Sequence, residues 1–294
     1  LVSNYDHKMM MFHGYKPSFQ LKELTKNRLA QVNGLTDKTE EFIFPNYERK
    51  AFAKKSISSI TKKFNEFEIT REGDQIYGKP LVKTSLFPEF FVETGLGKKL
   101  NKSVMEWRWD FNNLLIDIAK HYRASSSKND KAKLENMFID LFDDGIEQGF
   151  AEGAGLGWVY HYAYEIREIG PAFLLMRDVL ARHERLEQAI ATMKWFYGFG
   201  QVYREDVVYG VEGRKAADAD DTQGFLLPRL YMALAMKNSP EKIRDLEHYS
   251  SYFSNITTAY APALDEVFKP DGLTFHHGGH SQGYGGRAVK AAAA

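Results

Sequence analysis

Apolar residues recur at intervals of three and four along most of this 294-residue chain. That spacing places them on one face of an α-helix, which has about 3.6 residues per turn. The pattern runs in segments of roughly fifteen to twenty-five residues joined by polar or glycine-rich stretches, as in antiparallel helix pairs. No short repeat interrupts it. The sequence therefore predicts an all-α fold, an open or toroidal array of helices.

The expected breaks follow proline, glycine and serine signals. Pro17 begins the first helix and Asn33-Gly34 ends it, while residues 68–86 predict a loop with a short strand at Gln75–Tyr77. The other predicted helices cover residues 44–67, 104–125, 128–150, 160–183, 185–200, 222–237 and 240–260. We divide the chain into a helical lead-in at 1–100, a catalytic region at 101–290 and a non-native alanine tail at 291–294.

Composition excludes several classes of protein. Hydrophobic residues make up 44% of the chain, which is typical of a globular domain, and no apolar run reaches transmembrane length. The formal net charge is zero, so bulk charge gives no support for nucleic-acid binding. Cysteine is absent, which excludes disulfides, thiolate metal sites and cysteine nucleophiles. The chain starts at Leu1 without a methionine, and we expect it to be a fragment.

The most unusual segment is KPDGLTFHHGGHSQGYGG, residues 269–286. His277 and Tyr284 lie seven residues apart in it, a spacing that puts them on one face of a helix or lets them converge in a glycine-rich loop. An imidazole is a natural general base, and a phenol can pass a proton in either direction. Two alternatives remain open: a structural turn, or a zinc site made of His276, His277 and His280.

A second group lies in GWVYHYAYEIREIG, residues 157–170, where His161, Tyr164 and Arg167 share a helical stripe. They form either a buried aromatic face or the wall of a groove for an acidic sugar. Further along, AADADDTQG at 216–224 places acids before a helix, where the positive end of the helix dipole favours them. Carboxylates in that segment could also serve a glycosidase.

Read in order, these segments resemble the α-helical domain of polysaccharide lyase family eight, and more narrowly its chondroitin ABC lyase branch. The resemblance runs through IEQGFAEGAGLGWVYHYAYEIREIGPAFLLMRDVL, ADADDTQGFLLPRLYMALAM and FKPDGLTFHHGGHSQGYGG, and it covers roughly residues 105–290. It implies an incomplete (α/α) toroid, with His277 and Tyr284 as the catalytic pair and His161 in the same cleft. The family's arginine and glutamate would belong to missing C-terminal segments of the same enzyme.

The resemblance also implies a substrate and a reaction. We expect β-eliminative cleavage of sulfated glycosaminoglycan chains, with no cofactor required and no nucleic-acid or membrane partner. Aromatic rings can stack on sugars and a guanidinium can pair with sulfate or carboxylate. The residues expected to bind substrate are Arg167, Tyr164, Trp158, Tyr160 and His276, with Tyr162 and Trp107 or Trp109 as further stacking candidates.

Other functions are compatible with the same residues. The alternatives are an (α/α)-barrel hydrolase of acidic sugars that uses carboxylates such as Asp220 and Asp221, or a non-catalytic glycosaminoglycan-binding module. Because polymeric glycosaminoglycans do not enter cells intact, we expect a bacterial protein that is secreted or periplasmic.

Overall fold

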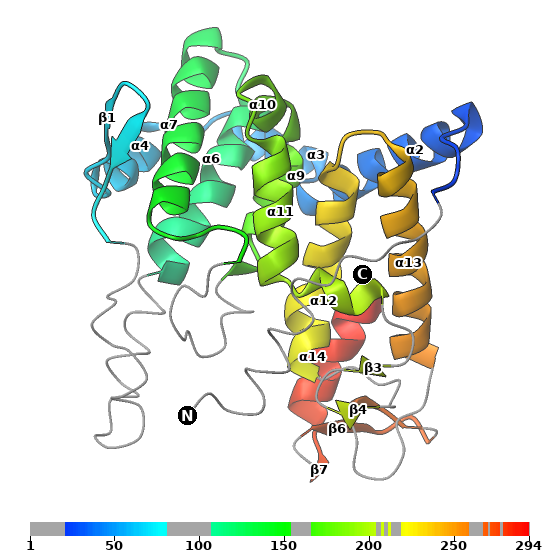
Figure 1. The fold of residues 1–294 in the computed structure, drawn as a ribbon. Helices are drawn as coiled ribbons and strands as arrows, with labels where there is room; N and C mark the ends of the chain where they lie inside the picture. Colours follow the sequence, from blue (N-terminus) through cyan, green and yellow to red (C-terminus); the bar gives the residue numbers. More distant parts are fainter. Residues whose placement is uncertain are drawn as a thin grey trace. The chain divides into compact units, whose positions relative to one another are not determined.

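A computed structural model of the chain describes residues 21–80, 107–153, 166–203, 207–208, 211–212, 219–258, 267–269, 271–276 and 279–293. Helices dominate this part of the chain, and its strands are only two or three residues long (Figure 1). The all-α expectation is therefore confirmed, while the toroid stays a prediction. In these same ranges, no helix combines the length and apolar character that a membrane span requires.

The elements follow one another with these bounds. The helices are α2 (Lys26–Ile43), α3 (Asn46–Phe52), α4 (Ser58–Asn65), the π-helix η3 (Trp107–Asn112), α6 (Asn113–Ala124), α7 (Lys128–Glu147), α9 (Ile169–Leu175), α10 (Arg177–Arg182), α11 (Leu186–Phe196), the 3-10 helix η4 (Phe199–Tyr203), α12 (Ala219–Ala235), α13 (Pro240–Thr258) and α14 (Gln282–Ala293). The strands are β1 (Thr70–Glu72), β2 (Gln75–Tyr77), β3 (Val207–Val208), β4 (Val211–Glu212), β5 (Val267–Phe268), β6 (Thr274–His276) and β7 (Gly279–His280).

The chain forms two compact units. The central unit comprises Gly34–Thr192, and the terminal unit comprises Leu1–Asn33 with Met193–Ala294. The boundaries fall within α2 and α11. The division expected between residues 100 and 101 falls outside the described residues and stays a prediction.

In the central unit, α7 shows how local sequence sets a helix. Ser127 caps it, because its hydroxyl oxygen accepts a hydrogen bond of 3.2 Å from the backbone N–H of Asp130. Phe138 and Phe142 then follow at helical spacing, and both are fully buried. Their rings pack edge-to-face on Phe173 of α9 at centroid distances of 6.1 and 5.5 Å. The apolar stripe of α7 thus becomes the core of this unit.

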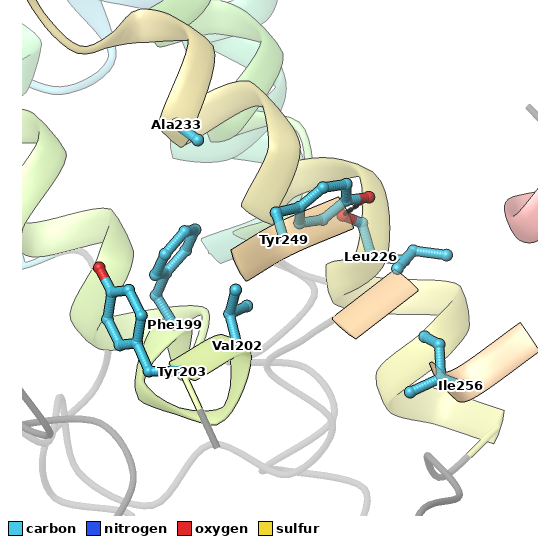
Figure 2. Packing of buried hydrophobic residues seen from close by; sticks show 7 residues of the cluster. All are labelled: Phe199, Val202, Tyr203, Leu226, Ala233, Tyr249 and Ile256. Carbon is cyan, nitrogen blue, oxygen red and sulfur yellow. Dashed lines mark hydrogen bonds between the residues drawn. The ribbon is translucent and has the colours of Figure 1, made fainter. Parts of the chain in front are cut away.

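The terminal unit has a core of its own between η4, α12 and α13. Its buried cluster consists of Phe199, Val202, Tyr203, Leu226, Ala233, Tyr249 and Ile256 (Figure 2). Tyr249 is buried along with the apolar residues, and its hydroxyl donates a 2.9 Å hydrogen bond to the backbone oxygen of Leu226. Burial raises the pKa of Tyr249 and holds this phenol neutral.

The predicted end of the first helix is wrong. Helix α2 runs through Asn33-Gly34 and ends at Ile43. A glycine weakens a helix interior by only about 1 kcal/mol, which tertiary contacts can exceed. Here Glu40 is buried in the turns beyond the glycine and binds both Arg123 and Arg177. Those ion pairs hold the helix past its expected stop.

The single helix predicted over 44–67 is also wrong, because α3 and α4 are separated by a turn at residues 53–57. The N–H groups of Lys54 and Lys55 donate to oxygens three residues back, at 3.3 and 2.9 Å, which tightens the end of α3. Ser56 then accepts a 3.2 Å hydrogen bond from the N–H of Ser58. The local serine bonds start a new helix axis.

The strand predicted at Gln75–Tyr77 is confirmed as β2, which pairs antiparallel with β1 across a turn at Gly73. The helix predicted over 104–125 begins in the described residues as the π-helix η3 and continues as α6. In the described part of 160–183, two short helices, α9 and α10, replace one long helix. The expectations for 128–150 and 240–260 are confirmed by α7 and α13, which end slightly earlier.

Candidate active site

The candidate site is built on the tract at 269–286, which is not a loop throughout. It contributes β6, β7 and the first turn of α14, so the expectation of a glycine-rich loop is wrong for residues 282–286. Strand β6 is central, because it pairs with β5 on one side and with β7 on the other. A small antiparallel sheet therefore supports the segment that contains the predicted catalytic pair.

The first turn of the tract depends on its aspartate and glycine. The backbone N–H groups of Lys269 and Gly272 donate to the oxygens of Leu273 and Lys269, at 2.9 and 3.0 Å. Asp271 accepts a 3.0 Å hydrogen bond from the N–H of Leu273. Gly272 has a φ of 79°, a conformation that glycine adopts without strain. This tight turn sends the chain from β5 into β6.

Strand β6 is joined closely to α14. The backbone N–H of Ser281 donates to the oxygen of Thr274, and the Thr274 hydroxyl donates to the oxygen of Ser281, both at 3.0 Å. A Cβ atom added at Gly285 would lie 1.6 Å from Oγ1 of Thr274, so only a glycine permits this approach. The first turn of α14 is thereby locked against the strand.

Tyr284 is held by this packing. Its partly buried side chain packs with Phe268 of β5 against Ala219 and Ala288, two fully buried residues of α12 and α14. Helices α12 and α14 lie side by side (Figure 1). The guanidinium carbon of Arg287 lies 5.8 Å from the centroid of the Tyr284 ring, a cation–π arrangement. The phenol thus has a defined orientation and a cation beside it.

His277 and Gly278 lie outside the described residues, but the strands on either side of them are described. His276 is the last residue of β6, and its backbone pairs with Gly279 of β7. The strand that carries Thr274 against Gly285 therefore leads directly to His277, three residues further along. The structure thus places β6, which leads to His277, against the helical turn that contains Tyr284.

Most of the upstream candidates lie outside the described residues, namely His161, Tyr164, Trp158, Tyr160 and Tyr162. Only the backbone is described for His276, Trp107 and Trp109, and likewise for Asp220 and Asp221 in the first turn of α12. Arg167 is described: it lies in a turn before α9, and its Nε is 3.3 Å from the carboxylate of Glu168. Arg167 is therefore not in a regular helix, as the predicted helical stripe would require.

No cluster of three or more residues able to ligate a metal occurs in the described ranges. Because the zinc alternative needs His277 and the side chain of His276, it lies outside them.

Two contributors to the site were missed from the sequence. Arg287 is the first, and its position three residues after Tyr284 in a helix would have placed it near the ring. The role of Thr274 had no local signal, because its contact with Gly285 depends on how β6 and α14 pack.

The helical scaffold behind this site is fixed by buried polar contacts. Arg229 of α12 donates hydrogen bonds to the oxygen of Tyr197, to Gln201 and to the hydroxyl of Tyr252, at 2.7, 3.0 and 2.8 Å. Asp245 of α13 accepts hydrogen bonds from Lys194 and from Tyr203. These contacts fix α12, and α12 in turn supports α14 and Tyr284.

Comparison with known proteins defines the class. A family model described as "Lyase, catalytic" matches residues 19–294. The chain therefore belongs to this family of lyase catalytic domains, and the resemblance identified from the sequence is confirmed.

The curated relatives are lyases of chondroitin sulfate. The chain is 28% identical over 265 residues to the chondroitin sulfate ABC exolyase of Bacteroides thetaiotaomicron, covering 89% of this chain and 25% of the relative. It is 23% identical over 288 residues to the chondroitin sulfate ABC endolyase of Proteus vulgaris, covering 96% of this chain and 27% of the relative. The chain thus spans about a quarter of the length of these relatives.

Proposed function

We propose that the full-length protein containing this chain cleaves chondroitin sulfate and dermatan sulfate by β-elimination at a uronic acid. The observation that carries the proposal is the placement of Tyr284 on α14, locked against the strand that leads to His277, within a lyase catalytic domain. The names of the relatives support chondroitin sulfate as the substrate.

The reaction needs a base and an acid but no attacking water. The base removes the C5 proton of the uronate, the electron pair forms a C4–C5 double bond, and the C4–O bond breaks. The departing oxygen takes a proton from the acid. Because the C5 proton is weakly acidic, the adjacent carboxylate must be neutralised or hydrogen-bonded as negative charge develops.

Tyr284 is proposed as the acid, and for one uronate epimer also as the base. His277 takes the proton on the opposite face or holds the carboxylate, and His161 acts on iduronate. The reason is stereochemical: glucuronate and iduronate present the C5 proton on opposite faces, so an enzyme that accepts both needs proton acceptors on both sides. Arg287 keeps the Tyr284 ring oriented through the cation–π contact.

Replacing Tyr284 tests this assignment most directly. Tyr284→Phe removes only a hydroxyl from a partly buried ring, so folding and polymer binding should persist while turnover falls roughly a thousandfold or more. Tyr77→Phe, in an exposed tyrosine of β2, is the matched control and should keep full turnover. The readout is the ultraviolet absorbance of the unsaturated uronate. Near-normal turnover of Tyr284→Phe on both substrates would end this mechanism.

The same assay separates the alternatives. A hydrolase that uses Asp220 or Asp221 would create reducing ends without the unsaturated absorbance, and a non-catalytic module would create neither. His161→Ala should impair dermatan sulfate cleavage more than chondroitin sulfate cleavage.

We further propose that Arg167 binds a substrate oxyanion, together with stacking by Trp158, Tyr160 and Tyr164 and a contact from His276. Arg167 is partly exposed, and its Nε lies 3.3 Å from the carboxylate of its neighbour Glu168, an ion pair that an anionic ligand could replace. Arg167→Ala should weaken oligosaccharide binding and reduce its salt dependence. Unchanged affinity and salt dependence would remove Arg167 from the binding set.

The proposed cellular location of the protein follows from the proposed substrate class. Glycosaminoglycan polymers are degraded outside the cytoplasm, so we propose a secreted or periplasmic protein, which fractionation of the source cells would test.

A further inference from the structure

The helices α3 and α4 of the central unit form the most basic stretch of the chain. From Arg49 to Asn65 the sequence contains six lysines and arginines and no acid, whereas the whole chain has a formal net charge of zero. Such a local excess creates a positive potential that bulk composition conceals. Five of these bases are exposed, and four of them, Lys50, Lys54, Lys55 and Lys62, differ from Lys63, which pairs with Asp117. We call these four residues the lysine surface.

Three acids near these helices form ion pairs with bases outside the lysine surface. Glu41 pairs with Arg49 at 3.4 Å, Glu48 with Lys120 at 3.6 Å, and Asp117 with Lys63 at 3.5 Å. Glu66 follows the last residue of α4. Among the residues that the structure describes, none of the four members of the lysine surface has a carboxylate within 4.0 Å.

An aromatic ring stands at one end of this surface. Tyr47 is 72% exposed and lies three residues before Lys50, so these two side chains share one stripe of α3. Lys54 follows in the turn after α3. An exposed ring beside a row of cations can stack on a pyranose while the lysines meet its anionic groups.

A third feature orients the surface. The Nζ atom of Lys55 lies 3.8 Å from the centroid of the Phe52 ring, and Nζ of Lys120 lies 5.9 Å from the same ring. Phe52 itself packs edge-to-face on Phe44 and His121, at 5.2 and 4.9 Å. The ring that supports Lys55 is therefore anchored in the core, which limits the freedom lost when the lysine binds an anion.

We propose that the lysine surface and Tyr47 bind the sulfated polysaccharide chain as a docking surface in addition to the residues of the proposed catalytic tract. The inference rests on the proposed function for the identity of the polymer. Charge complementarity selects the occupant: a polymer with an anionic group on every disaccharide can contact several lysines at once, whereas a short oligosaccharide cannot. The surface raises the residence of long chains on the enzyme.

The test compares two quadruple variants of the full-length protein. One carries Lys50→Gln, Lys54→Gln, Lys55→Gln and Lys62→Gln. The control carries the same loss of charge at exposed lysines elsewhere, namely Lys26→Gln, Lys38→Gln, Lys128→Gln and Lys133→Gln. Thermal unfolding first establishes that both fold like the wild type. Binding to immobilised chondroitin sulfate is then measured over a series of salt concentrations.

The first variant should bind the polymer about tenfold or more weakly at low salt, and the slope of log affinity against log salt should decrease. The control should stay within about twofold of the wild type. Tyr47→Ala should weaken binding severalfold at high as well as low salt, because stacking depends little on ionic strength. Turnover of a tetrasaccharide should not change in either quadruple variant.

Two outcomes would overturn the proposal. Equal losses in both quadruple variants would mean that only net charge matters. Stronger competition by single-stranded DNA than by free chondroitin sulfate would assign the surface to a different polyanion. A wild-type protein that produces no unsaturated uronate would instead refute the proposed function, and the binding comparison would still decide whether this surface takes the polymer.

Discussion

The two units hold buried charge in different ways. In the terminal unit, Arg229 has no exposed surface, and its guanidinium donates hydrogen bonds to three neutral oxygen atoms. In the central unit, the buried Asp143 binds Arg71 and Arg185, each at 2.8 Å, and both arginine side chains remain about a third exposed. Asp245 of the terminal unit likewise pairs with two partly exposed cations, Lys194 and Arg244, so the completely enclosed cation Arg229 is what distinguishes this unit.

The difference shows which contacts carry the fold. A fully enclosed charge has lost its hydration, so every hydrogen bond that replaces water becomes essential. A partly exposed arginine keeps some hydration and is screened by salt, so its ion pair contributes less. Arg229 lies in α12, and its partners lie just after α11, in η4 and in α13. Helix α12 in turn packs against α14, which carries Tyr284. In the central unit, Arg71 attaches the β1–β2 hairpin to α7, and Arg185 attaches the residue before α11 to the same acid.

Removing one arginine from each unit tests this contrast. Arg229→Met should lower the free energy of unfolding by about 3–5 kcal/mol, because three buried oxygens lose their donor. Arg185→Met leaves Asp143 bound to Arg71 and should cost about 1 kcal/mol or less. Urea unfolding of the two variants measures both values. Similar losses would show that enclosure does not distinguish the two arginines.

Glycines at close contacts provide a second comparison. In the terminal unit, a Cβ at Gly285 would lie 1.6 Å from the Thr274 side chain and 2.2 Å from its Cβ, which is fixed to the strand. In the central unit, a Cβ at Gly145 would lie 2.8 Å from the tip of the Phe111 ring, which can shift slightly. Gly285→Ala should therefore lower the free energy of unfolding by about 1–3 kcal/mol, the usual range for overpacking. This loss should exceed that of Gly145→Ala.

A neighbouring glycine supplies the matched control. Gly286 lies in the same helix and has nothing within 4 Å of an added Cβ, so Gly286→Ala should stabilise the protein by about 0.5–1 kcal/mol. Thermal unfolding gives the stability of each variant, and turnover reports on Tyr284. If Gly285→Ala behaves like Gly286→Ala, the packing of α14 on β6 is not as close as described.

The smallest expected effects concern two acids of α7, and they have opposite signs. Burial raises the pKa of Asp144, although a hydrogen bond from Gln148 opposes the shift. Burial alone would also raise the pKa of Glu135, but its hydrogen bonds and ion pairs with His183 and Arg182 bring that pKa below the usual value. The central unit thus contains one acid that favours the protonated form and one that favours the ionised form.

The stability profiles should follow these directions. For Asp144, the folded state binds the proton more tightly, so stability falls as pH rises from the ordinary value of 3.8 through the raised pKa. Asp144→Asn should remove that loss and stabilise the protein at neutral pH. For Glu135, stability is present above 4.5 and is lost as pH falls through the lowered pKa, so Glu135→Gln should destabilise the protein at neutral pH. Urea unfolding at several pH values would contradict this if both variants changed stability in the same direction.

Local sequence was a good guide where an element depends on its own pattern. Helix α7 follows from the Ser127 cap and an apolar stripe, and α13 follows from the Ser239-Pro240 start. Strand β2 was predicted where glycine and proline interrupt the helical pattern in residues 68–86, and its residues alternate between exposed and buried in the structure. In the candidate site, the spacing of His277 and Tyr284 left a structural turn and a zinc site open, and the resemblance to the lyase family selected the two residues.

The sequence was a poor guide where distant contacts override a local preference. Gly34 signalled a helix end, but the ion pairs of Glu40 with Arg123 and Arg177 keep α2 intact. The glycines after Ser281 signalled a loop, although they form the first turns of α14.

The sequence by itself determined the helical class and the position of the longest helices, because periodicity is a local property, and its resemblance to the lyase family supplied the residues proposed for catalysis. Only the tertiary structure decided that Tyr284 stands on a helix with Arg287 beside its ring. Glycines permit both loop and helix, and the choice between them came from the contact of Gly285 with Thr274. That contact joins residues of two separate elements, and no pattern within either element encodes the distance between them.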